Sequence, residues 1–235
     1  MIELTPQSAY LLGAILTDGQ LVTRPHQRCV VISVVDQDFA EAVEDCSFQT
    51  IGRHYTVARW QPKNPRQRAQ HRVQITNTAL HDWLFDLTHD KTRAPTTLLR
   101  RAPLEVRKHF LAGVMDGDGW VAIAARYHKA HYSVSSFAQI GVASTDPWLD
   151  DVKRITDSMG LISHGPTVMK RNNPNWRPIR HLRFKAIPFI EARIPLRIGR
   201  KRERLEGLLR HLESSEAIRQ DSGSEPRDGP TLTAT

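Results

Sequence analysis

The sequence LLGAILTDG at residues 11–19 returns as LAGVMDGDG at residues 111–119. Each matching residue in the second copy has a number 100 higher than in the first. The matched pairs are Leu11 with Leu111, Gly13 with Gly113, Asp18 with Asp118 and Gly19 with Gly119. A repeat with this spacing predicts two similar structural units in one chain.

The similarity continues downstream of both copies. Residues 36–52, DQDFAEAVEDCSFQTIG, match residues 144–160, STDPWLDDVKRITDSMG, at an offset of 108. The second unit therefore carries extra residues between its motif and this segment. We assign them to the stretch RYHKAHYSVSSF at residues 126–137.

The local signals give the same element order in both units. Thr5 and Pro6 cap a predicted helix over 6–18, and Pro103 with Glu105 opens its counterpart over 104–118. Gly19 and Gly119 are predicted to end these two helices. Each is followed by two β-rich stretches, a helix capped at Asp36 or Ser144, a second hairpin and a short helix, over about 77–87 or 187–193. The order is αββαββα, twice, in an α+β fold.

The composition sets the expected domain limits. We place the first unit at residues 1–87, a linker at 88–103 and the second unit at 104–213. Residues 214–235 are rich in Ser, Glu, Gly, Pro, Asp and Thr, so we expect a disordered tail there.

The charge is unevenly distributed along the chain. The formal net charge is +8, which favours a polyanionic partner only weakly by itself. The four predicted hairpins, however, contain no Asp or Glu, whereas basic residues are common in them. A solvated surface without a partner normally mixes both signs, so this pattern favours nucleic acid.

The alternation of residues along the hairpin strands indicates which sheet face carries the basic and polar side chains. Arg72, Gln74 and Thr76 share one strand face, opposite Val73 and Ile75. In the second unit, the face with His181, Arg183 and Lys185 lies opposite Leu182 and Phe184. Such polar side chains contact phosphates and base edges.

The glycines of the repeat predict close helix packing. Glycine inside a helix costs roughly 1 kcal/mol relative to alanine, so the matched Gly13 and Gly113 imply a contact between the two helices. That contact would bring together the C-terminal ends of the helices and with them Asp18 and Asp118. Two carboxylates at helix C-termini are unfavourable by charge, and cations between them would explain the pair. A single Asp-Gly helix end would be an ordinary turn.

These motifs resemble the paired motifs of the single-chain LAGLIDADG homing endonucleases, over about residues 5–210. The first copy departs from the family string at Leu16-Thr17. The resemblance implies a saddle-shaped antiparallel β-sheet surface for DNA, with the two motif helices at its centre. It further implies cleavage of double-stranded DNA with Mg²⁺ (or Mn²⁺) by a monomer that needs no protein partner. The target would be long and pseudo-palindromic or asymmetric, and the biological role would be the spread of an intron or other mobile element.

The resemblance assigns site residues. Metal binding falls to Asp18, Asp118 and the adjoining Gly19 and Gly119. A supporting basic residue near the end of each unit is matched best by Lys91 and Lys201, with Arg93, Arg197 and Arg200 as alternatives. Gln20 and Trp120 follow the two motifs and make the halves unequal. The expected DNA contacts are Arg24, Arg28, Arg59, Lys63, Arg66, Arg68, Arg72, Gln74, Arg126, Lys129, Lys170, Arg171, Arg177, Arg180, Arg183 and Lys185.

Other function classes lack support in the sequence. No phosphate-binding glycine loop, dinucleotide fingerprint or nucleophile elbow is present. Cys29 and Cys46 are interpreted as buried thiols, and the hairpin histidines, such as His54 and His71, as DNA-facing polar residues. No signal peptide or membrane span is evident, so we expect a cytoplasmic or nucleoid protein, with an organelle as an alternative, that is neither secreted nor bound to a membrane.

Two alternatives remain open at this point. One is an RNA maturase that assists intron splicing on the same fold. The other is a DNA-binding protein that has lost catalysis. The absence of flanking splicing-domain sequence favours a freestanding or intron-encoded enzyme over an intein.

Overall fold

The computed structural model describes residues 2–61, 68–128, 133–169 and 177–221. The first unit comprises α1 (Pro6–Asp18), β1 (Gly19–Arg24), β2 (Gln27–Val34), α2 (Gln37–Ile51), β3 (Ala58–Trp60), β4 (Gln70–Ile75) and α3 (Thr78–Thr88). The second comprises α5 (Leu104–Asp118), β5 (Gly119–His128), β6 (Ser133–Ser144), α6 (Leu149–Asp157), β7 (Ser163–Met169), β8 (Ile179–Phe184) and α7 (Ala186–Glu191). The predicted αββαββα order is confirmed in both units.

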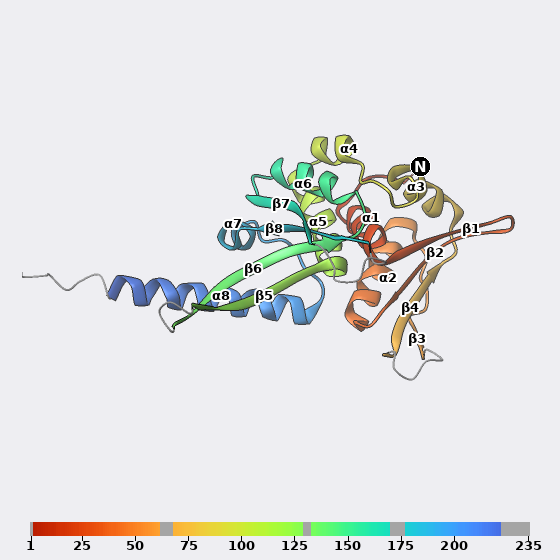
Figure 1. The fold of residues 1–235 in the computed structure, drawn as a ribbon. Helices are drawn as coiled ribbons and strands as arrows, with labels where there is room; N and C mark the ends of the chain where they lie inside the picture. Colours follow the sequence, from red (N-terminus) through yellow and green to blue (C-terminus); the bar gives the residue numbers. More distant parts are fainter. Residues whose placement is uncertain (1, 62–67, 129–132, 170–176, 222–235) are drawn as a thin grey trace, which may run out of the picture.

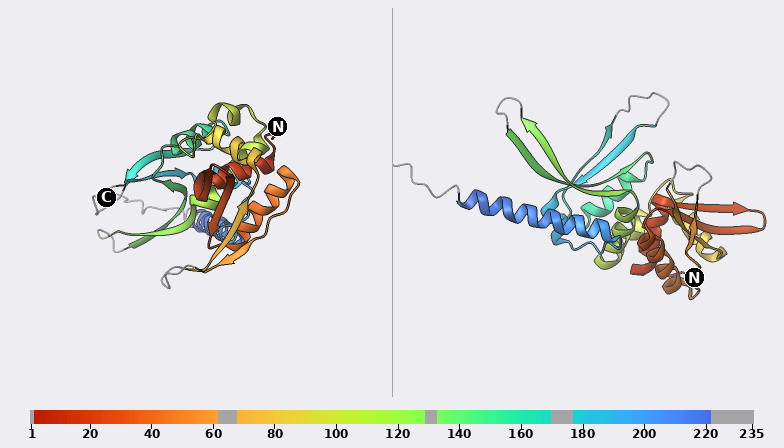
Figure 2. Two further views of the ribbon diagram at one scale, coloured as in Figure 1. Left: turned by 90° about the vertical axis from the view of Figure 1, so that its right-hand side faces the viewer. Right: turned by 90° about the horizontal axis from the view of Figure 1, so that it is seen from below.

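Each unit forms one antiparallel four-stranded sheet with the same topology. The strand orders are β1-β2-β4-β3 and β5-β6-β8-β7. The sheets extend to opposite sides of the paired helices α1 and α5, as Figures 1 and 2 show. The β5–β6 hairpin is longer than the β1–β2 hairpin, which confirms where the extra residues of the second unit lie.

Two helices lie outside the repeated order. The predicted linker contains the short helix α4 (Thr96–Arg101). The described part ends with α8 (Gly199–Asp221), which packs on β5 and extends into the segment from residue 214 that we expected to be disordered. Leu208 of α8 is fully buried, and this anchor near the middle of the helix accounts for order that composition did not predict. Residues 222–235 lie outside the described part.

The helix ends explain the local folding. At the start of α1, the Thr5 side chain accepts a hydrogen bond from the Ser8 amide, and the Ser8 hydroxyl accepts one from the Thr5 amide at 2.8 Å. In the second unit, the expected cap at Ser144 is wrong, because Ser144 ends β6 and α6 starts only after Trp148. Asp36 does precede α2, without a side-chain capping bond.

Gly19 and Gly119 end the motif helices in a different way from a left-handed cap. Both residues are extended, with φ of −77° and −82°, and the chain passes directly from helix to strand. A Cβ atom at either position would lie 2.6 Å from the Cα atom of Ile15 or Met115. Glycine is therefore required by the tight turn back over the helix.

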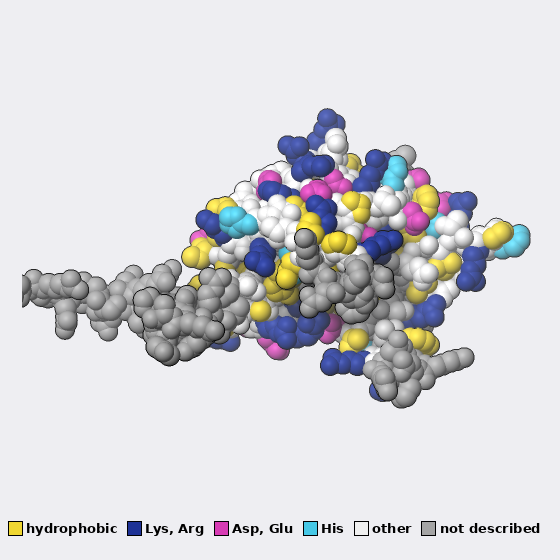
Figure 3. Space-filling model, viewed as in Figure 1, with side chains coloured by type: hydrophobic (Ala, Val, Ile, Leu, Met, Phe, Trp, Pro, Cys, Tyr) yellow, Lys and Arg dark blue, Asp and Glu magenta, His cyan; other side chains and the backbone are white. Residues whose placement is uncertain are grey.

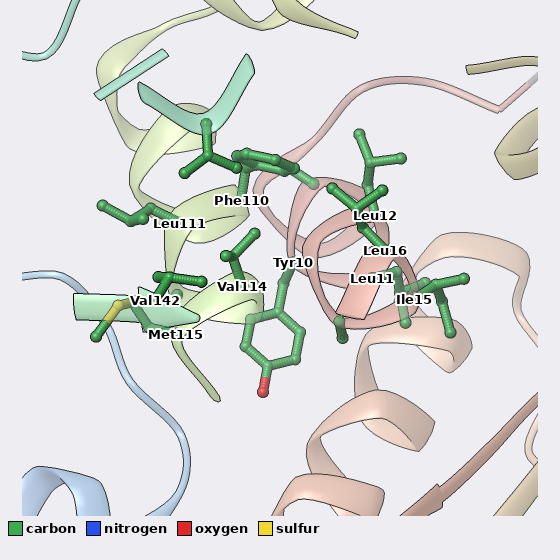
Figure 4. Close-up of a cluster of buried hydrophobic side chains, with 14 of the residues drawn as sticks. Tyr10, Leu11, Leu12, Ile15, Leu16, Phe110, Leu111, Val114, Met115 and Val142 are labelled. Carbon is green, nitrogen blue, oxygen red and sulfur yellow. The ribbon is translucent and has the colours of Figure 1, made fainter. Parts of the chain in front are cut away.

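The hydrophobic core is continuous through the centre of the molecule. Figure 4 shows buried side chains of α1, α5 and β6 in this core, among them Tyr10, Leu11, Phe110 and Val114. Cys29 and Cys46 are buried and free, as expected. Among the described helices, none combines the length and apolar character needed to cross a bilayer.

Candidate active site

The backbones of α1 and α5 touch at the matched glycines. A Cβ atom on Gly13 would lie 2.8 Å from the Val114 nitrogen, and one on Gly113 would lie 2.8 Å from the Ala14 nitrogen. Since both glycines meet the same part of the opposite helix, the contact has local two-fold symmetry. The predicted packing role of Gly13 and Gly113 matches this geometry.

This packing brings the two motif aspartates together. The space for a side chain at Gly117 is filled by Thr17 and by Asp18, whose Oδ2 atom lies 3.0 Å from the position of a Cβ atom. The Asp18 carboxylate thus contacts the residue that precedes Asp118. Two residues that are far apart in the sequence form one acidic site at the helix ends.

The surroundings of the two carboxylates disfavour their ionised forms. Burial, followed by repulsion from Asp18, raises the pKa of Asp118 to about 7. Burial also raises the pKa of Asp18, while the charges of Lys201 and Lys91 lower it. Asp18 is exposed on one side, so water reaches it there while protein on its other sides removes much of its hydration.

Lys91 contacts the end of α1. Its Nζ atom donates hydrogen bonds to the carbonyl oxygens of Thr17 at 3.0 Å and Gly19 at 2.5 Å. Burial lowers the pKa of Lys91, and the carboxylates of Asp18 and Asp118 raise it. The basic residue predicted near the end of the first unit therefore lies at the acidic site.

Lys201 contacts α5 in a similar way. Its Nζ atom donates to the carbonyl oxygens of Met115, Asp116 and Gly117, at 2.6, 2.6 and 3.0 Å. Burial lowers the pKa of Lys201 to about 8. A cation at the C-terminal end of a helix also offsets the helix dipole.

Two of the alternative basic residues form ion pairs elsewhere, and the third is on the surface. Arg197 pairs with Asp45 at 3.0 Å, and Arg200 pairs with Asp36 at 2.6 Å. Arg93 is exposed. The two lysines are thus the better candidates for the supporting role.

Sequence reasoning missed a buried polar cluster beside the site. The Asp116 carboxylate accepts hydrogen bonds from the Tyr10 hydroxyl at 2.9 Å and from the amides of Arg197 at 2.7 Å and Ile198 at 3.4 Å. Burial raises the pKa of Asp116. The signal in the sequence was the mismatch between Asp116 and Leu16, which we noted only as a departure of the first motif.

The donor set suits a hard divalent cation. In the described residues, no group of three or more His, Cys, Asp or Glu side chains could hold a metal. The available ligands are two carboxylates whose pKa values are raised by burial, and repulsion from Asp18 raises that of Asp118 further. Mg²⁺ is commonly bound by one or two carboxylates together with water and substrate phosphate, and such an ion would relieve this repulsion.

The sheet of the first unit presents a polar face next to the acidic site. Cross-strand pairing aligns Gln20 with Val31 and Val31 with Gln74. Arg24 and Arg72 lie on the same face and both act electrostatically on Cys29. These side chains line a depression of about 420 Å³. Figure 3 shows Lys and Arg along the β1–β2 and β3–β4 hairpins, with acidic side chains mainly on the helices above them.

Three of the expected DNA contacts lie on the other face of their strands. Arg28 pairs with Asp82 of α3 at 2.6 Å, and Arg180 pairs with Asp150 of α6 at 2.8 Å. Arg59 is opposite His71, so it lies on the face away from Arg72. These three side chains therefore lie away from the polar face, and the sequence prediction had not applied strand alternation to every basic residue. Arg28 and Arg180 each lie an odd number of residues along the strand from the residues of the polar face, so their side chains point to the opposite face.

Two histidines also differ from their expected orientation. His54 bonds Glu44 at 2.9 Å and stacks on Phe48 of α2, with ring centroids 3.8 Å apart. It therefore contacts the helix layer and not the polar face. His71 shares the strand face of Val73 and Ile75.

The second unit has a different surface beside its motif. Trp120, which replaces Gln20, lies against His181, with ring centroids 5.2 Å apart. Arg183 and Lys185 are exposed, as are Arg68 and Arg177 outside the strands. The backbone of Arg126 lies in β5, but its side chain is outside the described part, together with Lys63, Arg66, Lys129, Lys170 and Arg171 in full.

Comparison with known proteins relies on structure alone. No family model matches this sequence, and no curated protein matches it significantly. Solved structures that resemble it include the homing endonuclease I-WcaI bound to its DNA recognition sequence (TM-score 0.58, 12% identity, 87% of this chain and 88% of that chain). The meganuclease I-SmaMI bound to uncleavable DNA gives a TM-score of 0.55 at 10% identity and covers 96% of this chain and 98% of its own.

A third similar protein was solved with metal ions. Mesophilic variants of the homing endonuclease I-DmoI match with a TM-score of 0.52 and 13% identity, over 80% of this chain and 93% of theirs. I-DmoI has been solved in complex with DNA and Mn, and with DNA and Ca. The chain described here therefore has the two-unit fold of the LAGLIDADG homing endonucleases.

Proposed function

We propose that this chain is a site-specific endonuclease that hydrolyses phosphodiester bonds in double-stranded DNA with a divalent metal. The observation that carries the proposal is the meeting of Asp18 and Asp118 at the ends of α1 and α5. The acidic site lies between two sheets whose hairpins carry basic side chains. The DNA complexes of proteins with the same fold support the same partner.

The residues of the site have complementary roles in this proposal. Asp18 and Asp118 hold Mg²⁺ or Mn²⁺ next to Gly19 and Gly119, and Lys91 and Lys201 supply positive charge beside them. When bound, the metal supplies Lewis acidity that activates water and stabilises the leaving oxygen. The carboxylates act as ligands and not as general bases, because coordination to a cation lowers their affinity for a proton.

The two sheets provide the DNA surface. Arg24, Arg72 and Gln74 contact one half-site from the first unit, and Arg183 and Lys185 contact the other from the second. Because Gln20 and Trp120 differ, the two half-sites have different sequences. The protein acts as a monomer on a long, asymmetric or pseudo-palindromic target, and its biological role is the homing of an intron or other mobile element.

A plasmid-library cleavage assay tests the proposal. The purified protein is incubated with a supercoiled library of random target sites, with Mg²⁺ or with chelator. Linear product that requires Mg²⁺ and is abolished by Asp118→Asn supports the proposal. Binding to a selected site without any cutting, or splicing assistance on an intron RNA without cutting, would replace it with one of the two alternatives.

A further inference from the structure

We infer that the two site lysines have unequal roles: Lys91 keeps a hydrogen-bond donor for the reacting groups, whereas Lys201 positions the end of α5. The inference rests on the proposed function and identifies Lys91 as the lysine that contacts the reacting groups. It follows from donor counts, burial and one difference in sequence between the motifs.

The ammonium group of Lys201 is fully occupied. A lysine ammonium has three N–H donors, and Lys201 uses them on the carbonyl oxygens of residues 115, 116 and 117, at 2.6, 2.6 and 3.0 Å. The residue is only 2% exposed. A new bond from Lys201 to phosphate or water would break one of these three bonds with the end of α5.

Lys91 retains one donor. Its hydrogen bonds within the described residues are those to the carbonyl oxygens of Thr17 and Gly19, which leaves the third N–H available. Lys91 is half-buried, and both motif aspartates act on its charge. It is thus placed to donate to a phosphate oxygen or to the attacking water.

The two lysines also sit at different depths along their helices. Lys91 reaches past the end of α1 to Gly19, the counterpart of Gly119. Lys201 bonds Gly117, the counterpart of Thr17, but its other two bonds reach back along the helix to Asp116 and Met115. The lysine positions therefore do not follow the internal symmetry of the chain.

The buried Asp116 gives a cause for this displacement. Asp116 is the strongest electrostatic attraction on Lys201, and its counterpart in the first motif is the apolar Leu16. No equivalent negative charge draws Lys91 back along α1. The sequence difference between the motifs thus directs Lys91 past the end of α1 and Lys201 back along α5, while the charges of both lysines act on Asp18.

Strand-resolved cleavage tests this inference. Lys91→Met and Lys201→Met are compared on a selected duplex with each strand labelled, in single-turnover reactions over a range of Mg²⁺ concentrations. Lys108→Met is the matched control, since Lys108 lies near the opposite end of α5. We expect Lys91→Met to slow one strand by roughly 10²-fold or more, with nicked product accumulating at every Mg²⁺ concentration. Lys201→Met should lower the melting temperature and show no strand bias, and high Mg²⁺ should restore its rate because the misplaced Asp118 still binds metal.

A second measurement does not depend on cutting. Brief treatment of the folded protein with an amine-specific reagent, followed by peptide mass spectrometry, should label Lys91 and leave Lys201 unlabelled. Equal labelling of the two lysines would overturn the inference. A strand-specific loss of cleavage rate in Lys201→Met that high Mg²⁺ does not restore would also overturn it. If the wild-type protein cuts no DNA, the proposed function fails, and the labelling result alone decides whether the lysines differ.

Discussion

Gly13 of α1 and Gly113 of α5 contact each other's helix backbones so closely that a Cβ atom on either would lie 2.8 Å from a main-chain nitrogen of the other helix. This contact sets the separation of the helix ends that carry Asp18 and Asp118. The fold and the acidic site therefore depend on the same two residues.

Replacing either glycine by alanine should destabilise the protein. We expect Gly13→Ala and Gly113→Ala each to lower the free energy of unfolding by about 1–3 kcal/mol, because the helices must separate. Gly207→Ala in α8 is the control: its Cβ would meet only the far end of Arg210, at 3.8 Å, so a helical gain of about 0.5–1 kcal/mol is expected. Denaturant titrations of the three variants measure this, and equal effects at all three positions would contradict the packing account.

The repeat is the reason that so much of the fold was predictable from the sequence. Matched glycines and aspartates placed α1 and α5 correctly and predicted that their ends meet. The roles of Arg28 and Arg180 were not predictable from composition, since pairing with Asp82 and Asp150 depends on strand parity and on where the helices pack. The helix α8 was also missed, because its anchor is tertiary packing of a mostly charged segment.

The polar pair Tyr10 and Asp116 should be energetically coupled. Tyr10→Phe removes a hydrogen-bond donor from the buried Asp116 carboxylate, so we expect the free energy of unfolding to fall by about 1–3 kcal/mol. In an Asp116→Leu background, which copies Leu16 of the first motif, Tyr10→Phe should lower the free energy of unfolding by less. A double-mutant cycle by denaturation gives the coupling, with Tyr55→Phe as a control, because its hydroxyl bond to the Thr76 carbonyl is exposed. Additive effects of the two changes would contradict the coupling.

The stability of the metal-free protein should depend on Asp118. Its pKa is raised from 3.8 to about 7 by burial and by Asp18, so the stability that it contributes is fully present below about pH 4 and is lost as the pH rises through 7. In chelator at pH 8, Asp118→Asn should therefore melt at least about 2–4 °C higher than the wild type, and the difference should shrink toward pH 5. A lower melting temperature for Asp118→Asn at pH 8 would be inconsistent with this electrostatic account.

Added Mg²⁺ should reverse that order. A ligand that binds only the folded state raises its melting temperature, so the wild type should gain stability with Mg²⁺ at pH 8 and Asp118→Asn should gain less. Thermal melts over a Mg²⁺ series measure this difference. Identical gains would argue against Asp118 as a metal ligand.

The two faces of the first sheet should differ in DNA binding. Arg72 lies on the polar face, and its buried Nε atom has no hydrogen-bond partner among the described residues, whereas Arg28 pairs with Asp82. Arg72→Ala should weaken binding and reduce the slope of log K against log salt by about 1. Arg28→Ala should leave that slope unchanged. Fluorescence anisotropy on a selected duplex measures the affinity and the salt dependence of both variants. A larger change for Arg28→Ala than for Arg72→Ala would place the DNA on the face opposite Arg72 and contradict the prediction.

Binding and cutting measured on one preparation test the central claim most directly. On a selected duplex, the wild type should bind in Ca²⁺ or Mg²⁺ and cut in Mg²⁺, and the Asp18→Asn/Asp118→Asn double variant should bind the same duplex without cutting either strand. Cutting that persists in the double variant would contradict the account, as would a wild-type protein that binds its selected site and never cuts it.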